Sequence, residues 1–299
     1  MNYLSACCIA KQEHAYLEEW IDYHLRVGVE HFFIYDDGDP GDQPLAELLA
    51  GHVARGTVEV RRAPAGARKQ MLAYEDCLRR DAESSVWVAF FDVDEFLVPR
   101  AAPDVRTLLA SREGEGGFGV NWLVYGSSGH AVPPPGGVIA SYVWRSKPSF
   151  KANTQIKSIV RPTRARAARN PHAFDYAPGF HCVNERGRTV DDAWCRHGAE
   201  TIQINHYFTK SRQEFMAKAQ KGRAEGGRFT KRFVGSFDSA EEMFDYYDRK
   251  CSVVEDRFIQ RYVTADAPAG AAGAPAWRAG SPAGRTGAAA DGSGLRRGS

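Results

Sequence analysis

Short apolar runs alternate with amphipathic stretches along the first hundred residues. The runs predict strands that are covered on both faces, and the stretches carry apolar side chains at helical spacing. The predicted strands are residues 4–10, 31–35, 57–61 and 86–91. The predicted helices are residues 13–27, 43–55 and 68–81. Alternation of this kind favours right-handed crossovers, and so a Rossmann-like, mostly parallel α/β sheet flanked by helices.

After residue 100 the pattern changes to strands separated by Gly, Ser and Pro turns, followed by helices. This pattern predicts a mixed sheet with covering helices. The predicted strands here are residues 118–125, 138–144, 155–161 and 201–208, and the helices are 211–221 and 240–262.

The last part of the chain has no apolar periodicity. Residues 265–299 consist largely of Ala, Gly, Pro, Ser and Arg, which predicts a disordered tail. The expected organisation is one α/β domain over 1–264, with halves 1–100 and 101–264, followed by this tail.

Composition and charge narrow the class of protein. The chain is 43% hydrophobic and 25% charged, which is ordinary for a folded globular protein. Its formal net charge is only +2, and the tail arginines account for that excess. No general basic field therefore indicates a nucleic-acid partner.

Targeting features and cysteine spacing predict a reduced, cytoplasmic protein. We find no signal-peptide pattern and no apolar run of the roughly 20 residues that cross a bilayer, although peripheral contact with the inner membrane remains compatible with the sequence. The six cysteines form no close CxxC pair. A zinc site from Cys182, Cys195 and either His181 or His197 is the alternative, although this spacing matches no common zinc pattern.

Acidic residues follow two of the predicted strands. Asp36 and Asp37 come after residues 31–35, and Asp92-Val93-Asp94 follows residues 86–91. Ligands of parallel sheets bind beyond the carboxyl ends of the strands, so these carboxylates are expected at one edge. Asp92 and Asp94 provide hard oxygen ligands for a divalent cation that binds phosphates, and Asp36 or Asp37 could accept hydrogen bonds from a ribose or a base. Solvated turns after the strands would also explain both segments.

Basic residues and a histidine extend this expected site. Arg68, Lys69 and Gln70 open the third helix, whose free N–H groups favour phosphate; a solvated basic helix end is the alternative. His206 ends an apolar strand, where it would complete a metal shell or contact phosphate, or else pack as a core residue.

If the site transfers a group from a phosphate-containing donor to a hydroxyl group, a catalytic base is also needed to take the hydroxyl proton. Asp191 and Asp192 form the acidic pair of the second half and are the predicted catalytic residues. Glu185, Asp175 and Glu200 compete with them, and a surface loop would also explain the pair.

Several segments occur in a characteristic order along the chain. They are Ile9-Ala10-Lys11-Gln12-Glu13, Tyr16 to His24, Gly28 to Asp37, Lys69-Gln70 with Tyr74 and Cys77-Leu78, Phe91 to Phe96, Trp122 with Tyr125 to His130, Lys157 to Pro162, and Asn205 to Ser211. Together these segments resemble glycosyltransferase family 92 and related bacterial family 2-like enzymes. They span roughly residues 4 to 225. One departure is Gln12, which stands where the family usually has Asn.

The resemblance implies a GT-A fold, a nucleotide-sugar donor such as a UDP- or GDP-sugar, and Mn²⁺ or Mg²⁺. It implies that Asp92, Asp94 and His206 contact the metal. It also implies an acceptor-side group, made of Ser127, Ser128, Gly129, His130 and Lys157.

The leading hypothesis is therefore an inverting, metal-dependent glycosyltransferase acting on a glycan or lipid-linked acceptor. A nucleotidyltransferase or phosphatase with the same metal carboxylates is one alternative. A phosphatase of this kind would place its nucleophilic Asp after the first strand, and residues 4–10 end without one. A non-catalytic nucleotide-sugar-binding protein is the other alternative.

Overall fold

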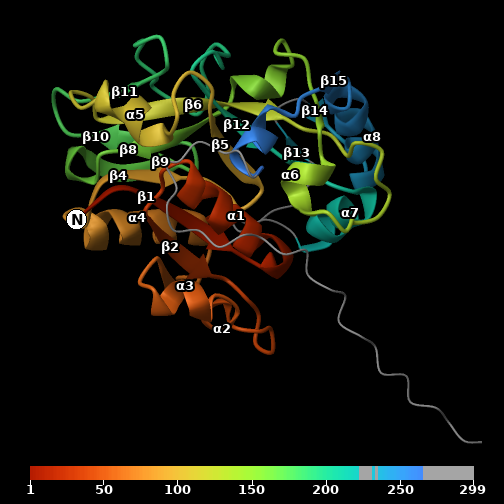
Figure 1. Cartoon of the computed structure of the whole chain (residues 1–299), viewed down its shortest axis with the longest axis horizontal. Helices are drawn as coiled ribbons and strands as arrows, with labels where there is room; N and C mark the ends of the chain where they lie inside the picture. The colour runs from red at the N-terminus through yellow and green to blue at the C-terminus, as the bar shows by residue number, and fades with distance from the viewer. Residues whose placement is uncertain (222–230, 233–234, 265–299) are drawn as a thin grey trace, which may run out of the picture.

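A large mixed sheet forms the centre of the computed structural model, which describes residues 1–221, 231–232 and 235–264 (Figure 1). Its strand order is β3-β2-β1-β4-β8-β6-β12-β5, and β11 joins it beside β6. The strands are β1 (Asn2–Ala10), β2 (His31–Asp36), β3 (Val58–Arg62), β4 (Ser85–Phe90), β5 (Glu95–Pro99), β6 (Gly117–Val124), β8 (Ile156–Val160), β11 (Cys182–Val183) and β12 (Ile202–His206).

The first part of the sheet is entirely parallel. β1 pairs with β2 on one side and with β4 on the other, and β2 pairs with β3. The chain thus moves outward from β1 to β3 and then returns past β1 to β4. The strand order reverses between β1 and β4, and open α/β sheets bind their ligands beyond the carboxyl ends of the strands at such a reversal.

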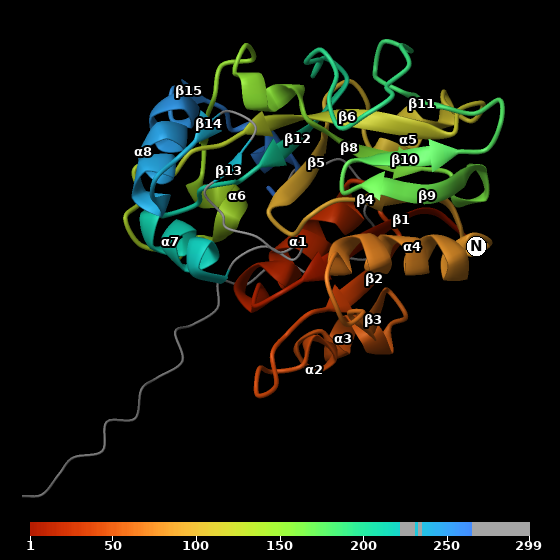
Figure 2. The same ribbon diagram turned by 180° about the vertical axis from the view of Figure 1, so that it is seen from behind.

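Side chains of β1 alternate between two apolar layers. Cys8 points into the layer that holds Trp20 of α1, whereas Cys7 points into the layer that holds Tyr74 of α4. Figure 2 shows α4 and the β9–β10 hairpin on the side of the sheet away from α1. The elements that cover the sheet are α1 (His14–Arg26), α2 (Leu45–Leu48), α3 (Ala50–Ala54), α4 (Lys69–Asp81), α5 (Val105–Ala110), β9 (Ala165–Asn170) and β10 (Ala173–Tyr176).

Antiparallel strands extend the sheet in the second half. β8 pairs antiparallel with both β4 and β6, and β12 lies parallel to β6 and antiparallel to β5. Figure 1 shows α6, α7 and α8 beyond this end of the sheet, whereas η2 contacts β4 and α4. The remaining elements are α6 (Gly137–Ser141), β7 (Trp144–Arg145), η1 (Lys151–Thr154), η2 (Pro162–Arg164), α7 (Arg212–Lys221), β13 (Lys231–Arg232), β14 (Gly235–Ser236), α8 (Ala240–Cys251), β15 (Val254–Glu255) and η3 (Phe258–Tyr262).

This architecture confirms the predicted fold class, a mostly parallel α/β sheet flanked by helices with a mixed second half. Three element predictions were wrong. The helix predicted over 43–55 is broken into α2 and α3. The strand predicted over 138–144 is α6 followed by β7, because the Glu19 carboxylate accepts hydrogen bonds from the Val138 and Ile139 N–H groups and so caps a helix. The helix predicted over 240–262 ends at Cys251.

The structure also contains strands and a helix that the apolar pattern did not predict, namely β5, β9, β10, β11 and α5. The predicted tail, 265–299, lies outside the described residues. Within the described part of the chain, no helix is long and apolar enough to cross a membrane.

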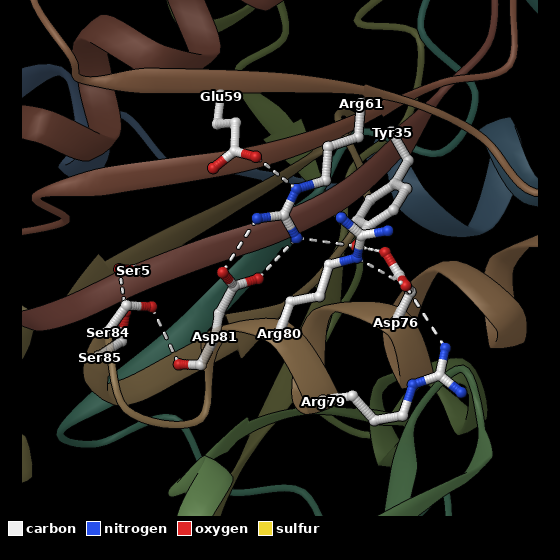
Figure 3. Close-up of polar contacts among 10 residues, drawn as sticks. All are labelled: Ser5, Tyr35, Glu59, Arg61, Asp76, Arg79, Arg80, Asp81, Ser84 and Ser85. Atoms are coloured by element: carbon white, nitrogen blue, oxygen red, sulfur yellow. Dashed lines mark hydrogen bonds and ion pairs between the residues drawn. The ribbon is translucent and has the colours of Figure 1, made fainter.

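An ion-pair network ties the edge strand β3 to β2 and α4 (Figure 3). The Arg61 guanidinium binds both carboxylate oxygens of Asp81 at 2.6 and 2.9 Å and also donates to the Tyr35 hydroxyl at 3.1 Å. That hydroxyl donates to Asp76 at 2.9 Å, and Arg61 lies 4.8 Å from the Phe33 ring centroid. Only 12% of the Arg61 side chain and 9% of the Asp81 side chain are exposed. The fork geometry suits a buried bidentate pair, and the network fixes α4 against the sheet.

A buried histidine joins α1 to β5 through two hydrogen bonds. The His24 Nδ1 atom lies 2.7 Å from the Trp20 carbonyl, and its Nε2 accepts from the Leu97 N–H at 3.0 Å. These partners require a neutral ring with the proton on Nδ1. Burial lowers the pKa of His24 from 6.5 to about 3, despite the hydrogen bond to Trp20.

This histidine predicts a loss of stability in mild acid. Because the folded-state pKa is depressed, the unfolded chain binds the proton first, so stability is full above pH 6.5 and falls as the pH drops toward 3. At pH 5 the expected loss from His24 is about 2 kcal/mol. Urea unfolding at pH 7 and pH 5 should show this extra loss in the wild type and not in His24→Gln. An equal loss in both proteins would contradict the assignment.

Candidate functional site

The carboxyl ends of β2 and β4 meet at the start of α4. Lys69, the first residue of α4, pairs with Asp37 beyond the end of β2. Gln70, the next residue, donates to Asp92 Oδ1 at 2.7 Å beyond the end of β4. The predicted gathering of these residues at one edge is therefore present. α4 links the two acidic strand ends across the point where the strand order reverses.

Asp92 is held between two side chains and keeps part of its carboxylate in contact with solvent. Besides Gln70, it binds Lys157 of β8, whose Nζ lies 3.0 Å from Asp92 Oδ2. The Asp92 side chain is 38% exposed, whereas that of Lys157 is only 2% exposed. Burial would raise the pKa of Asp92, but the Lys157 ammonium outweighs it and the net pKa is lowered. Asp92 is thus a solvent-facing carboxylate with a fixed, buried counter-ion.

Glu95 lies beneath Asp92 and is fully buried. Its Oε2 accepts from the Asp92 N–H at 2.8 Å and lies 3.7 Å from Lys157 Nζ. Burial raises the pKa of Glu95 well above its usual range, and Lys157 offsets this only in part. Burial also lowers the pKa of Lys157, but its two acidic neighbours outweigh that effect and raise it. Lys157 therefore stays charged beneath the site.

Strand pairing brings Asp94 to His206. In the antiparallel β5–β12 register, His206 is opposite Glu95, and the Tyr207 N–H donates to the Asp94 carbonyl at 2.8 Å. The His206 Nε2 atom consequently lies 3.6 Å from Asp94 Oδ2, and each of these side chains is about 5% exposed. The sequence-predicted pair thus meets although the two residues are far apart along the chain.

Lys218 of α7 also binds Asp94. Its ammonium pairs with the same Oδ2 oxygen that faces His206. Burial alone would raise the pKa of Asp94, but Lys218 and His206 outweigh it and hold this pKa well below its usual range. Asp94 is therefore ionised at neutral pH, which is what a ligand of a cation requires.

The side chains around Asp94 provide ligand atoms that suit a divalent cation bound together with phosphates. Such ions take one or two protein carboxylates and draw most other ligands from the substrate and water, and Mn²⁺ also accepts imidazole. Asp94 and His206 provide one carboxylate and one imidazole on the same side. Within residues 1–221, 231–232 and 235–264, no three His, Cys, Asp or Glu side chains form a metal-binding cluster. Asp94 and His206 could therefore supply the protein ligands of such a cation.

The remaining residues predicted to bind the donor lie beside this centre. Asp36 Oδ1 accepts from the Gly38 N–H at 2.8 Å and its Oδ2 from the Leu45 N–H at 3.1 Å, so this carboxylate shapes the turn after β2. Asp37 is 5% exposed. Arg68 is the N-cap residue of α4 and has a left-handed backbone, with φ of 59°.

Left-handed backbone at residues other than glycine is concentrated around the site. Gln12 after β1, Arg68 before α4, Ser128 after β6 and Lys210 after β12 all have φ between 49° and 59°. Strain of this kind collects at functional sites because surrounding contacts must impose it.

The predicted acceptor-side loop is held by hydrogen bonds to neighbouring elements. The Ser127 N–H donates to Asp248 of α8 at 2.8 Å, and Ser128 Oγ accepts from the Val143 N–H at 2.9 Å. His130 Nε2 lies 3.2 Å from the Ser141 carbonyl, and Gly129 is exposed at the tip. The loop thus joins β6 to α6, β7 and α8, and Gly129 is its freely accessible backbone.

The predicted catalytic pair lies on the loop after β11. Asp192 Oδ1 accepts from Asn170 Nδ2 at 3.1 Å and from the Ala193 N–H at 2.7 Å, and the Asp191 carbonyl accepts from Arg169. Both aspartates are exposed. Their hydrogen bonds connect them to the β9–β10 hairpin rather than to Asp92 or Asp94.

The competing residues have partners of their own. Asp175 pairs with Arg169, Glu200 pairs with Arg186, and Glu185 accepts from the Thr201 N–H. The alternative zinc site is not assembled: Cys182 is buried beside the Val183 carbonyl, and Cys195 contacts Asn121 and Asn184. No metal cluster forms from these residues in the part of the chain that the structure describes.

A small pocket opens beside His206 on the β6 side. Trp122 forms one wall, and its ring centroid lies 4.1 Å from that of His206. The buried Trp122 Nε1 has no hydrogen-bond partner among the described residues. The lining residues are Trp122, Val124, Ala152, Gln155, His206, Phe208 and Tyr247.

Sequence reasoning missed Glu95 and Lys218 as members of the site. Glu95 directly follows the acidic segment, and its place in an apolar run indicates burial. Lys218 lies seven residues after Ser211 and three after the fully buried Phe215, on the same helical stripe. The sequence signal for Lys218 was therefore its position on the buried stripe of a helix.

The fold and the site together define an α/β domain that gathers carboxylates, lysines and a histidine where parallel strands end. Residues 4–233 match the model of glycosyltransferase family 92. This chain belongs to glycosyltransferase family 92.

Relatives and solved structures resemble parts of the chain. A glycosyltransferase family 92 protein of Oryza sativa subsp. japonica is 30% identical over 207 residues, covering 68% of this chain and 33% of that protein. A galactan beta-1,4-galactosyltransferase of Arabidopsis thaliana is 29% identical over 201 residues, covering 64% of this chain and 38% of that protein. A crystal structure of S. aureus TarS 1–349 in complex with UDP-GlcNAc has 12% identity and a TM-score of 0.33, and covers 54% of this chain and 45% of that one. This chain spans only about a third of the length of the two curated relatives.

Proposed function

We propose that this chain is a divalent-cation-dependent glycosyltransferase that uses a nucleotide-sugar donor, a UDP- or GDP-sugar, and inverts the transferred anomeric carbon. Its acceptor is a hydroxyl group of a glycan or a lipid-linked sugar. The observation that supports this most is the meeting of Asp94, His206 and Lys218 beyond the carboxyl end of β4. Membership of family 92 supports the same class of reaction.

In this proposal, different residues bind different parts of the donor. Asp94 and His206 hold Mn²⁺ or Mg²⁺, and Asp92 faces the same diphosphate with its exposed edge. Lys69, at the start of α4, and Asp37, just beyond the end of β2, face the nucleoside. When bound, the cation stabilises the negative charge that grows on the departing diphosphate.

On the acceptor side, a hydroxyl oxygen attacks the anomeric carbon while the bond from that carbon to the diphosphate oxygen breaks. A carboxylate takes the hydroxyl proton, and the exposed Asp191 and Asp192 are proposed for this role. The exposed tip of the loop at Gly129 and the neighbouring Ser128 would border the acceptor.

Donor binding and slow donor hydrolysis test the proposal directly. UDP- and GDP-sugars are titrated into the full chain with Mn²⁺ and again with a chelator, and nucleotide release is followed. UDP-galactose is the first donor to try, because relatives include galactan beta-1,4-galactosyltransferases. Manganese-dependent binding and release of a nucleoside diphosphate are expected. If no nucleotide-sugar binds or is consumed under either condition, the proposal fails.

A further inference from the structure

Lys218 and Lys157 each neutralise one carboxylate of the Asp92-Val93-Asp94 segment, but they differ in freedom to move. The Lys157 side chain is 2% exposed and lies beneath Asp92 and Glu95. The Lys218 side chain is 32% exposed and extends from α7 to Asp94. Lys157 is therefore a fixed counter-ion, whereas Lys218 has solvent beside it into which it can turn.

Lys218 occupies the position on Asp94 that a cation would use. Its ammonium binds Oδ2, which is also the oxygen that faces His206 Nε2 at 3.6 Å. Its ammonium also lies 5.1 Å from the centroid of the Phe208 ring, between β12 and α7. An ammonium and a divalent cation cannot both take the same carboxylate oxygen at full strength, because the two positive charges repel at this distance.

Other charges around Asp94 do not make Lys218 redundant. Lys210 also acts on Asp94, but it is 9% exposed and its ammonium lies 3.5 Å from the centroid of the Tyr16 ring. A buried carboxylate left without a close partner is strongly unfavourable. Asp94 therefore needs Lys218 whenever no other cation is bound to it.

We propose that Lys218 competes with the divalent cation for Asp94, and that it pairs with the donor diphosphate once the cation is in place. The proposal rests on the function proposed above. The exchange keeps the buried Asp94 neutralised at every stage. It also moves one positive charge onto the phosphates at the moment when the donor brings its negative charge into the site.

Two binding measurements on the full chain test this exchange. The first follows Mn²⁺ by the electron paramagnetic resonance signal of the free ion, without nucleotide. We expect Lys218→Met to bind Mn²⁺ about tenfold more tightly than the wild type, because its competitor is gone. The second measures UDP binding by calorimetry at saturating Mn²⁺, where we expect about tenfold weaker binding, because one phosphate contact is lost.

Two further variants serve as controls. Arg212→Met removes one positive charge from the same helix, where Arg212 pairs with the exposed Asp245, and should leave both affinities unchanged. Lys218→Arg keeps the charge and should keep Mn²⁺ binding close to the wild type. Thermal unfolding of each variant confirms that it is folded.

The outcomes separate this inference from the proposed function. If the wild type binds UDP but Lys218→Met binds Mn²⁺ no more tightly than the wild type, or if Mn²⁺ binds neither protein, the exchange is wrong. Unchanged UDP affinity in Lys218→Met contradicts the diphosphate contact. If the wild type binds no nucleotide or nucleotide-sugar at all, the proposed function fails instead.

Discussion

Asp94→Asn is expected to reduce metal-dependent glycosyl transfer or donor hydrolysis by about 10³-fold, which corresponds to about 4 kcal/mol of lost transition-state stabilisation. The substitution keeps the shape of the side chain but removes the charge that faces His206 and Lys218. A neutral amide is a poor ligand for a divalent cation, so charge on the leaving diphosphate is no longer offset. Rates with saturating donor and Mn²⁺ give the measurement.

A matched control separates this effect from a general change of charge. Asp245→Asn removes the same charge from α8, where the side chain is 66% exposed and pairs with Arg212. This variant should retain wild-type rates. If Asp94→Asn keeps wild-type activity, the metal site is not at Asp94.

Arg61→Ala is expected to lower the free energy of unfolding by about 3–5 kcal/mol. The guanidinium holds both oxygens of Asp81, and its removal leaves that buried carboxylate without its bidentate partner (Figure 3). It also leaves the Tyr35 hydroxyl without one donor. Chemical unfolding monitored by circular dichroism gives the measurement.

The network around α4 also offers a control for the arginine substitution. Arg79→Ala removes a guanidinium that is 73% exposed and lies 3.4 Å from Asp76, so it should cost less than about 0.5 kcal/mol. In a double-mutant cycle, Arg61→Met with Asp81→Leu should cost much less than the sum of the single changes, because no unpaired charge stays buried. Additive costs would show that the two side chains do not act as a pair.

Apolar periodicity was enough to predict the half of the fold that brings Asp37 and Asp92 together. Each of the first four predicted strands is present within two residues of its expected bounds. Because parallel strands end at one edge, the order of strands and helices along the chain is sufficient to place Asp37 and Asp92 together. The helix that opens at Lys69 and Gln70 joins them as its position in the sequence indicated.

Contacts between residues far apart in the sequence determine the elements that the apolar pattern did not predict. The Val138–Ser141 segment is apolar and β-branched, but the Glu19 carboxylate of α1 binds its first free N–H groups and favours a helix. No local rule reveals a cap provided by a side chain 119 residues away. The pairing of β5 with β12 is equally non-local, and it is the pairing that brings Asp94 to His206.

The loops that carry Ser127, Ser128, Asp191 and Asp192 were the least predictable part of the candidate site. From the sequence alone, Ser127 and Ser128 would be expected to be exposed polar residues. In the structure, the Ser127 N–H and the Ser128 hydroxyl form hydrogen bonds that hold α8 and β7 in place. The acidic pair Asp191 and Asp192 lies on an irregular loop whose path no periodicity describes. Chemistry that depends on loops is hard to place from sequence, because loops lack a repeating pattern.

A crystal grown with a UDP-sugar and Mn²⁺ tests the central claim most directly, through the anomalous scattering of manganese. We predict a manganese peak bonded to Asp94 and His206, with the donor diphosphate on its other side, beyond the carboxyl ends of β1 and β4. A bound nucleotide whose diphosphate lies away from this edge, or with no manganese at Asp94, would contradict the account.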